Sequence, residues 1–113
     1  MRYAMLVYAD ESTERSEEAV ETEYAAFMAF QDEMEVRGVL VARERLRETT
    51  LSTTVRVRDE GLVVADGPFA ETKEQIAGFY IIECADLDEA IEIASRNPGA
   101  RSGTIEVRPV WQL

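Results

Sequence analysis

The part of the sequence best suited to chemistry is residues 66–75, which read DGPFAETKEQ. Asp66 precedes Gly67 and Pro68, a stiff corner in which the proline ring fixes its own φ and favours extended backbone just before it. Such a corner holds a carboxylate at the end of a strand, where the carboxylate could act as a base. The alternative interpretation is structural, because aspartate before Gly-Pro is also a common turn former that bonds only nearby backbone.

Three charged side chains follow the corner, at Glu71, Lys73 and Glu74. They either join Asp66 in a ligand-binding site or decorate an exposed turn, where ion pairs contribute little. The capping-box spacing of residues 72–75 also predicts a short helix that begins at Lys73.

Two further candidates lie far from this segment in the sequence. Arg108 shares one face of the last predicted strand with Glu106, and from there it would pair with Asp66 or bind an anionic ligand. A partly exposed structural ion pair is an equal alternative for Arg108. Tyr3 would bring a hydroxyl group to a ligand pocket, although a tyrosine at strand spacing is also typical of a core.

The composition excludes several kinds of site. The 113 residues include 23 acidic and 12 basic side chains, one cysteine and no histidine. Without histidine there is no His-based triad, imidazole base or His-rich zinc site, and a single cysteine excludes an internal disulfide. The net charge of −11 argues against nucleic acid, because phosphate binding needs clustered Lys and Arg. We expect no metal, no cofactor and no nucleic-acid partner.

No segment of the sequence predicts export or membrane insertion. The N-terminus lacks the apolar stretch of a signal peptide, and no run approaches the roughly 18 apolar residues that span a bilayer. We therefore expect a cytoplasmic protein that does not associate with membranes. The length is that of a single domain over residues 1–113, since domains typically hold about 100–150 residues.

The elements that position these side chains follow from periodicity and caps. Ser16 and Asp86 are predicted N-caps of two helices, which end near Gly38 and at Asn97-Pro98-Gly99 respectively. Segments rich in apolar, β-branched and aromatic residues predict strands over residues 2–9, 39–45, 53–58, 62–65, 78–84 and 104–110.

Each predicted helix has one apolar stripe that should face the core. In the first helix the stripe contains Val20, Tyr24, Phe27, Phe30 and Met34. In the second it contains Leu87, Ala90, Ile91 and Ala94. The opposite side of the first helix is strongly acidic, since residues 10–35 contain ten acids and one base; this is typical of a solvated face.

The order β-α-β, hairpin, β-α-β predicts a ferredoxin-like α+β fold, with an antiparallel-rich sheet and both helices on one face. Two helices cover only one face of such a sheet. The strands at residues 2–9 and 78–84 are nevertheless apolar on both faces, whereas a half-solvated sheet alternates apolar with polar residues. We therefore predict a homodimer in which two subunits pack sheet face to sheet face.

Five strings of the sequence carry a family resemblance: DGPFAETKEQIAGFYIIE, LDEAIEIASRNPGA, EVRPV, MRYAMLVYAD and TTVRVRDEG. They resemble the DGPF-domain proteins of the YCII-related superfamily, and the similarity covers nearly the whole chain. The resemblance implies a ferredoxin-like fold that dimerises into a barrel-like assembly. It also implies a catalytic His–Asp pair in the wider superfamily, whose aspartate corresponds to Asp66 and whose histidine has no counterpart here. Chemistry at Asp66 would then use Glu71, Lys73, Glu74 or an arginine.

Three classes of function follow. The first is a small-ligand-binding or acid–base enzyme domain with a pocket at the dimer interface around Asp66. The second is a regulatory or protein-interaction module whose partner surface is the acidic first helix; the resemblance implies a link to extracytoplasmic-function sigma factors, which some family members adjoin or are fused to. The third is an inactive relative kept for assembly alone. An Asp66 in a concave apolar pocket would favour the first class, and a solvated Asp66 the other two.

Overall fold

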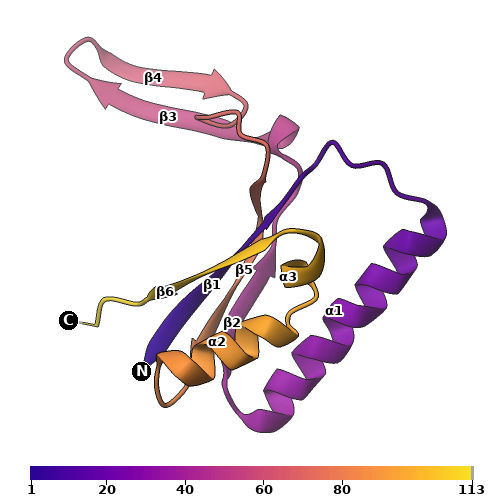
Figure 1. Cartoon of the computed structure of the whole chain (residues 1–113). Helices are drawn as coiled ribbons and strands as arrows, with labels where there is room; N and C mark the ends of the chain where they lie inside the picture. Colours follow the sequence, from indigo (N-terminus) through magenta and orange to yellow (C-terminus); the bar gives the residue numbers. More distant parts are fainter. Residues whose placement is uncertain (113) are drawn as a thin grey trace.

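Four strands form one antiparallel sheet in the computed structural model, which describes residues 1–112 (Figure 1). In their order across the sheet they are β2 (Leu40–Arg45), β5 (Gln75–Glu83), β1 (Arg2–Ala9) and β6 (Thr104–Pro109). A separate two-stranded sheet is formed by β3 (Thr53–Arg58) and β4 (Gly61–Asp66). This mixed α+β arrangement is consistent with the expected ferredoxin-like fold. The β3–β4 hairpin is inserted along the chain between β2 and β5.

Two longer helices, α1 (Glu17–Arg37) and α2 (Leu87–Arg96), begin and end at the predicted signals. The Ser16 and Asp86 side chains each accept a hydrogen bond from the backbone N–H three residues further on. Gly38 ends α1 with a left-handed φ of 72°, a conformation in which glycine carries no steric penalty. The structure contains two further short helical turns that the sequence did not predict, η1 (Thr49–Leu51) and α3 (Gly99–Ser102).

The short helix predicted from Lys73 is wrong. The segment before Gln75 is an irregular loop, and β5 already begins at Gln75. The Thr72 hydroxyl donates to the carbonyl of Glu74 at 2.6 Å, so it does not act as a helix N-cap. The loop thus passes directly from the end of β4 into the main sheet.

The core lies between the helices and one face of the main sheet. Its buried apolar side chains are Tyr3, Met5, Val7, Phe30, Met34, Tyr80, Ile82, Cys84, Ala90, Ile93 and Ala94. The rings of Phe30 on α1 and Tyr80 on β5 meet edge to face, with centroids 5.3 Å apart. The helices therefore cover the sheet face of Met5 and Tyr80, a choice that alternation in the sequence left open.

The apolar stripe predicted for α1 is only partly correct. Phe30 and Met34, in the C-terminal half of the helix, are buried. Val20 and Tyr24, in the N-terminal half, are 47% and 57% exposed. The exposure pattern agrees with the path of α1 in Figure 1, in which the N-terminal half stands away from the sheet.

The stripe predicted for α2 is rotated in the structure. Ala90 and Ala94 are buried as expected, but Leu87 and Ile91 are about half exposed, at 49% and 52%. Ile93, which the prediction omitted, is fully buried. The helix therefore packs through the side that contains Ala90, Ile93 and Ala94.

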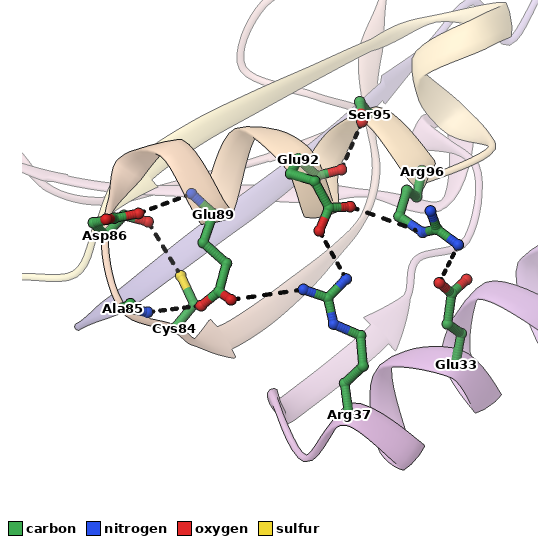
Figure 2. A network of polar contacts seen from close by, with 9 residues as sticks. All are labelled: Glu33, Arg37, Cys84, Ala85, Asp86, Glu89, Glu92, Ser95 and Arg96. Atoms are coloured by element: carbon green, nitrogen blue, oxygen red, sulfur yellow. Dashed lines mark hydrogen bonds and ion pairs between the residues drawn. The ribbon is translucent and has the colours of Figure 1, made fainter.

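Ion pairs join the C-terminal half of α1 to α2 (Figure 2). Arg37 on α1 contacts Glu92 on α2 at 2.9 Å and Glu89 at 3.7 Å. Arg96 on α2 pairs with Glu33 on α1 and lies 3.9 Å from Glu92. These contacts fix this half of α1 against the rest of the domain.

The other face of the main sheet is covered by no helix of the described chain. Cross-strand register places Leu6 beside Phe79 and Ala4 beside Ile81 on this side. We call the surface formed by Ala4, Leu6, Tyr8, Phe79 and Ile81 the open face. All five side chains are partly exposed, which confirms that both faces of the sheet are apolar.

The β3–β4 hairpin projects from the main sheet as an arm, residues 53–66 (Figure 1). Val55 pairs with Val64 and Val57 with Leu62, so these four side chains share one face of the arm. Each is more than half exposed, between 57% and 72%. The radius of gyration, 16.1 Å, exceeds the ~13 Å of a compact chain of this length. The arm is therefore an extended apolar surface outside the core.

Candidate functional site

A cavity of about 520 Å³ lies between α1 and the helix-facing side of the main sheet. Its apolar lining includes Val7, Val20, Phe27, Met28 and Leu46. Val20 and Tyr24, expected in the core, instead line this space, which accounts for their exposure. The volume falls within the ~300–1,000 Å³ range of small-molecule sites.

Two arginines on β2 line the cavity together with a tyrosine on β5. Arg43 lies directly opposite Tyr80, and Arg45 lies opposite Gly78. Because cross-strand partners and alternate residues share a face, both arginines lie on the helix-facing side with Tyr80. None of the ion pairs among residues 1–112 involves Arg43 or Arg45.

The carboxylates that line the cavity already have hydrogen-bond or ion-pair donors. Asp10 accepts from Ser12, Glu11 from Thr49, Glu23 from Arg15 and Glu48 from Arg47. The hydrogen bonds from Ser12 hold the pKa of the Asp10 carboxyl below its usual range. A fifth acidic residue, Glu44, pairs in register with Phe79 and so belongs to the side of the open face. The acceptors of the cavity are thus engaged, whereas the guanidinium donors of β2 are not.

Tyr80 adds a neutral donor to this group. Burial raises the pKa of the Tyr80 hydroxyl, and the positive charges of Arg43 and Arg45 act in the opposite direction. Since the net shift is upward from about 10, the hydroxyl is protonated at neutral pH. No hydrogen bond within residues 1–112 uses this hydroxyl, although the side chain lines the cavity.

The structure places Asp66 outside this cavity, exposed at the base of the arm. A turn is present at the predicted corner, but Gly67 is not extended as Pro68 would favour: its φ is 94°. The Gly67 N–H donates to the Ser52 carbonyl at 2.7 Å, and its carbonyl accepts from the Thr54 hydroxyl at 2.7 Å. Asp66 lies opposite Thr53 and two residues from Val64, so it shares the apolar face of the arm.

The charged residues that follow Asp66 lie in the β4–β5 loop. Glu71 and Lys73 are exposed and Glu74 is partly buried, and none of them lines the cavity. Lys73 lies near enough to Asp10 for its positive charge to contribute to the lowered pKa of that carboxyl. The loop is therefore a neighbour of the cavity rim rather than part of its wall.

Arg108 and Tyr3 lie on opposite faces of the main sheet. Arg108 donates to both carboxylate oxygens of Glu106, at 2.8 and 2.9 Å, rather than to Asp66, and Tyr8 donates to the same carboxylate at 3.1 Å. These hydrogen bonds lower the pKa of Glu106. Tyr3 is buried in the core, where its hydroxyl lies 3.8 Å from the Met1 sulfur. In the described part of a single subunit, the side chains of Asp66, Arg108 and Tyr3 therefore do not form one site.

The chain matches the YCII-related domain family over residues 1–113. It belongs to that family. A relative from Rhizobium meliloti (strain 1021), an uncharacterized protein, is 43% identical over 114 residues, which cover 97% of this chain and 92% of the relative. The family resemblance inferred from the DGPF segment is thereby confirmed.

The fold of this YCII-related chain is similar to that of a solved enzyme structure. That enzyme is the 5-chloro-2-hydroxyhydroquinone dehydrochlorinase from Burkholderia phenoliruptrix AC1100, in complex with 2,5-dihydroxybenzoquinone. The comparison has a TM-score of 0.56 and covers 99% of this chain and 94% of the other. At 15% sequence identity the likeness shows the fold alone.

Residues 1–112 contain no group of three or more Cys, Asp and Glu side chains placed to hold a metal ion. No helix in the same range combines the length and the apolar character needed to cross a bilayer.

Proposed function

We propose that this YCII-related chain is a small-molecule-binding domain whose ligand occupies the cavity between α1 and the sheet. The cavity itself carries this proposal: it has the volume of a small-molecule site, apolar walls from two elements, and a few polar groups on one side. Asp66, the residue favoured by the sequence, is exposed and lies outside the cavity, which speaks against a site built around Asp66. The proposal therefore rests on the cavity and not on Asp66.

The structural neighbour gives separate support for a ligand of this size. That enzyme was solved in complex with 2,5-dihydroxybenzoquinone, a small planar ring compound. A ring of that size fits comfortably in a space of about 520 Å³. The low identity transfers neither the substrate nor the reaction, so the proposal is limited to binding.

We further propose that two subunits form a homodimer through their open faces. Leu6, Phe79 and Ile81 form a continuous apolar surface on the uncovered side of the sheet. The apolar face of the arm adds Val57 and its three neighbours as a second exposed apolar surface, and we propose that the same partner copy covers it as well. Because Asp66 shares that arm face, the dimer would place it at the subunit boundary.

A thermal-shift screen tests the binding proposal, since a ligand of the native state raises its melting temperature. The panel holds small anionic, neutral and cationic organic compounds. Val20→Trp places a bulky ring in the cavity to obstruct it, and Val36→Trp, at an 89% exposed position of α1 outside the cavity lining, is the matched control. We expect compounds that stabilise the wild type and Val36→Trp but not Val20→Trp.

Two results would contradict the binding proposal. One is a panel in which no compound raises the melting temperature of the wild type. The other is a set of stabilising compounds that act equally on Val20→Trp. Either result would favour a protein-interaction module, the alternative function drawn from the acidic helix.

Sedimentation velocity tests the homodimer. Leu6→Glu on the open face and Val57→Glu on the arm should each yield monomers, because a buried unpaired charge is costly. Val36→Glu and Arg58→Glu change exposed residues on α1 and on the other face of the arm, and should leave the dimer intact. The homodimer proposal is wrong if the wild-type protein sediments as a monomer at every protein concentration.

A further inference from the structure

The acidic side chains of the cavity have hydrogen-bond or ion-pair partners, whereas its arginines on the sheet have no carboxylate partner within residues 1–112. Its carboxylates accept hydrogen bonds or ion pairs from Ser12, Thr49, Arg15 and Arg47. Its donors on the sheet, Arg43 and Arg45, have no carboxylate partner among the described residues. Three other exposed arginines in this part of the chain, Arg56, Arg58 and Arg101, also lack a carboxylate partner, but of these five only Arg43 and Arg45 line the cavity.

The geometry of these donors fits one ligand group. Arg43 and Arg45 occupy alternate positions of one strand, and Tyr80 lies directly opposite Arg43 on the next. The three side chains therefore line the same side of the cavity and can converge on one negatively charged oxygen group. Arginine suits this role because its planar fork donates two hydrogen bonds to a carboxylate or a similar anion.

The α1 wall of the cavity, opposite the arginines, contains the apolar side chains of Phe27 and Met28. Val7, on β1, adds an apolar side chain on the sheet side. A ligand that fills the space would therefore have an apolar body as well as its charged group. The aromatic ring of Tyr24 at the α1 wall favours a flat, unsaturated body, which can stack on it.

We propose that the ligand is a small aromatic or conjugated organic anion, a carboxylate or an ionised enol, held by Arg43, Arg45 and the Tyr80 hydroxyl. This inference rests on the proposed function, because it names the ligand class of the same cavity. Arg43 and Arg45 bind the charge, Tyr80 donates a hydrogen bond to it, and the apolar body lies against α1.

Three ring compounds of nearly equal size but different charge distinguish the effect of ligand charge from that of ligand shape: benzoate (anionic), benzamide (neutral) and benzylamine (cationic). Chemical-shift titrations in nuclear magnetic resonance should show benzoate binding at least about tenfold more tightly than the other two. Arg43→Gln/Arg45→Gln should remove this preference, and Tyr80→Phe should weaken benzoate several-fold. Arg101→Gln, an exposed arginine outside the cavity, is the control and should bind benzoate as the wild type does.

Circular dichroism melts of every variant ensure that a loss of binding is not a loss of fold. The inference is overturned if benzamide or benzylamine binds as tightly as benzoate, or if the double arginine variant keeps the wild-type preference. In both cases the proposed function stands if Val20→Trp still abolishes the binding that remains. If no compound of either panel binds, the proposed function itself fails, and the ligand class with it.

Discussion

Arg37 on α1 and Glu92 on α2 form an ion pair of 2.9 Å that fastens the two helices together (Figure 2). The pair lies at the C-terminal end of α1, where Met34 is also buried. The N-terminal half of the same helix instead forms one wall of the cavity. One helix thus has a fixed half that belongs to the core and a free-standing half that borders the cavity.

The ion pairs of Arg37 make a modest, salt-sensitive contribution to stability. We expect Arg37→Gln to lower the free energy of unfolding by about 0.3–1 kcal/mol at low ionic strength, because the pair is partly exposed and screened by ions. Urea denaturation at low and high salt measures the difference, which should shrink at high salt. Arg101→Gln serves as control. A loss that is independent of salt would mean that the alkyl chain of Arg37, rather than its charge, is responsible.

The packing side of α2 can be checked with two isoleucines on one helix. Ile93 is fully buried and Ile91 is 52% exposed. Ile93→Ala should cost about 2–4 kcal/mol of unfolding free energy, because it removes buried methyl groups and leaves a cavity. Ile91→Ala should cost less than about 1 kcal/mol. Equal losses in urea denaturation would show that the helix is rotated from the position described.

Gly103 tolerates no side chain where the chain enters β6. An added Cβ would lie 2.1 Å from the carbonyl oxygen of Tyr8, a backbone atom that cannot move aside without breaking the sheet. We expect Gly103→Ala to cost about 2 kcal/mol or more, measured by urea denaturation. Ser102→Ala, at the exposed position just before it, should be nearly neutral. Wild-type stability of Gly103→Ala would contradict this close approach.

The raised pKa of the Tyr80 hydroxyl predicts that the protein loses stability in alkaline solution. This pKa is raised in the folded state, so above pH ~10 the unfolded chain releases the phenolic proton more readily than the folded chain. The stabilisation is complete below that pH and is lost as the pH rises through the folded-state pKa. Denaturant midpoints from neutral to alkaline pH should therefore fall more steeply for the wild type than for Tyr80→Phe. Parallel curves would mean that Tyr80 ionises as freely as it does in the unfolded chain.

The sequence predicted the elements whose signals are local. Ser16 and Asp86 each supply a side-chain acceptor at a helix start, and the structure uses both. Gly61 has a φ of 110° in the turn of the predicted hairpin. The helix predicted from Lys73 failed because the Thr72 hydroxyl bonds a nearby carbonyl instead of capping, a choice that a sequence pattern alone does not decide.

The cavity was not predictable, because it depends on the tilt of α1. Val20 and Tyr24 have the same helical spacing as Phe30, so periodicity assigned all three to the core. The tilt comes from tertiary contacts at the other end of the helix, which periodicity does not record. The position of Tyr3 in the core, by contrast, was one of the two interpretations that its spacing allowed.

The sequence contained a weak indication that Arg43 and Arg45 belong to a binding site. Their alternate spacing places them on one face of a strand, the face that turned out to line the cavity. Arginines on an edge strand, however, commonly serve to deter unwanted pairing, and β2 is an edge of its sheet. What distinguishes these two roles is that the carboxylates of the cavity are already engaged by Ser12, Thr49, Arg15 and Arg47, which a sequence pattern does not reveal.

The arm has a further consequence for how the protein behaves at high concentration. Each of its two strands has a single neighbour, so the outer rim of both strands presents unpaired backbone amide and carbonyl groups. Such rims can recruit strands from other molecules and begin disordered aggregation. Arg56 and Arg58 lie on the face of the hairpin opposite Val55 and Val57, and we expect their like charges to oppose the approach of a second copy at these rims.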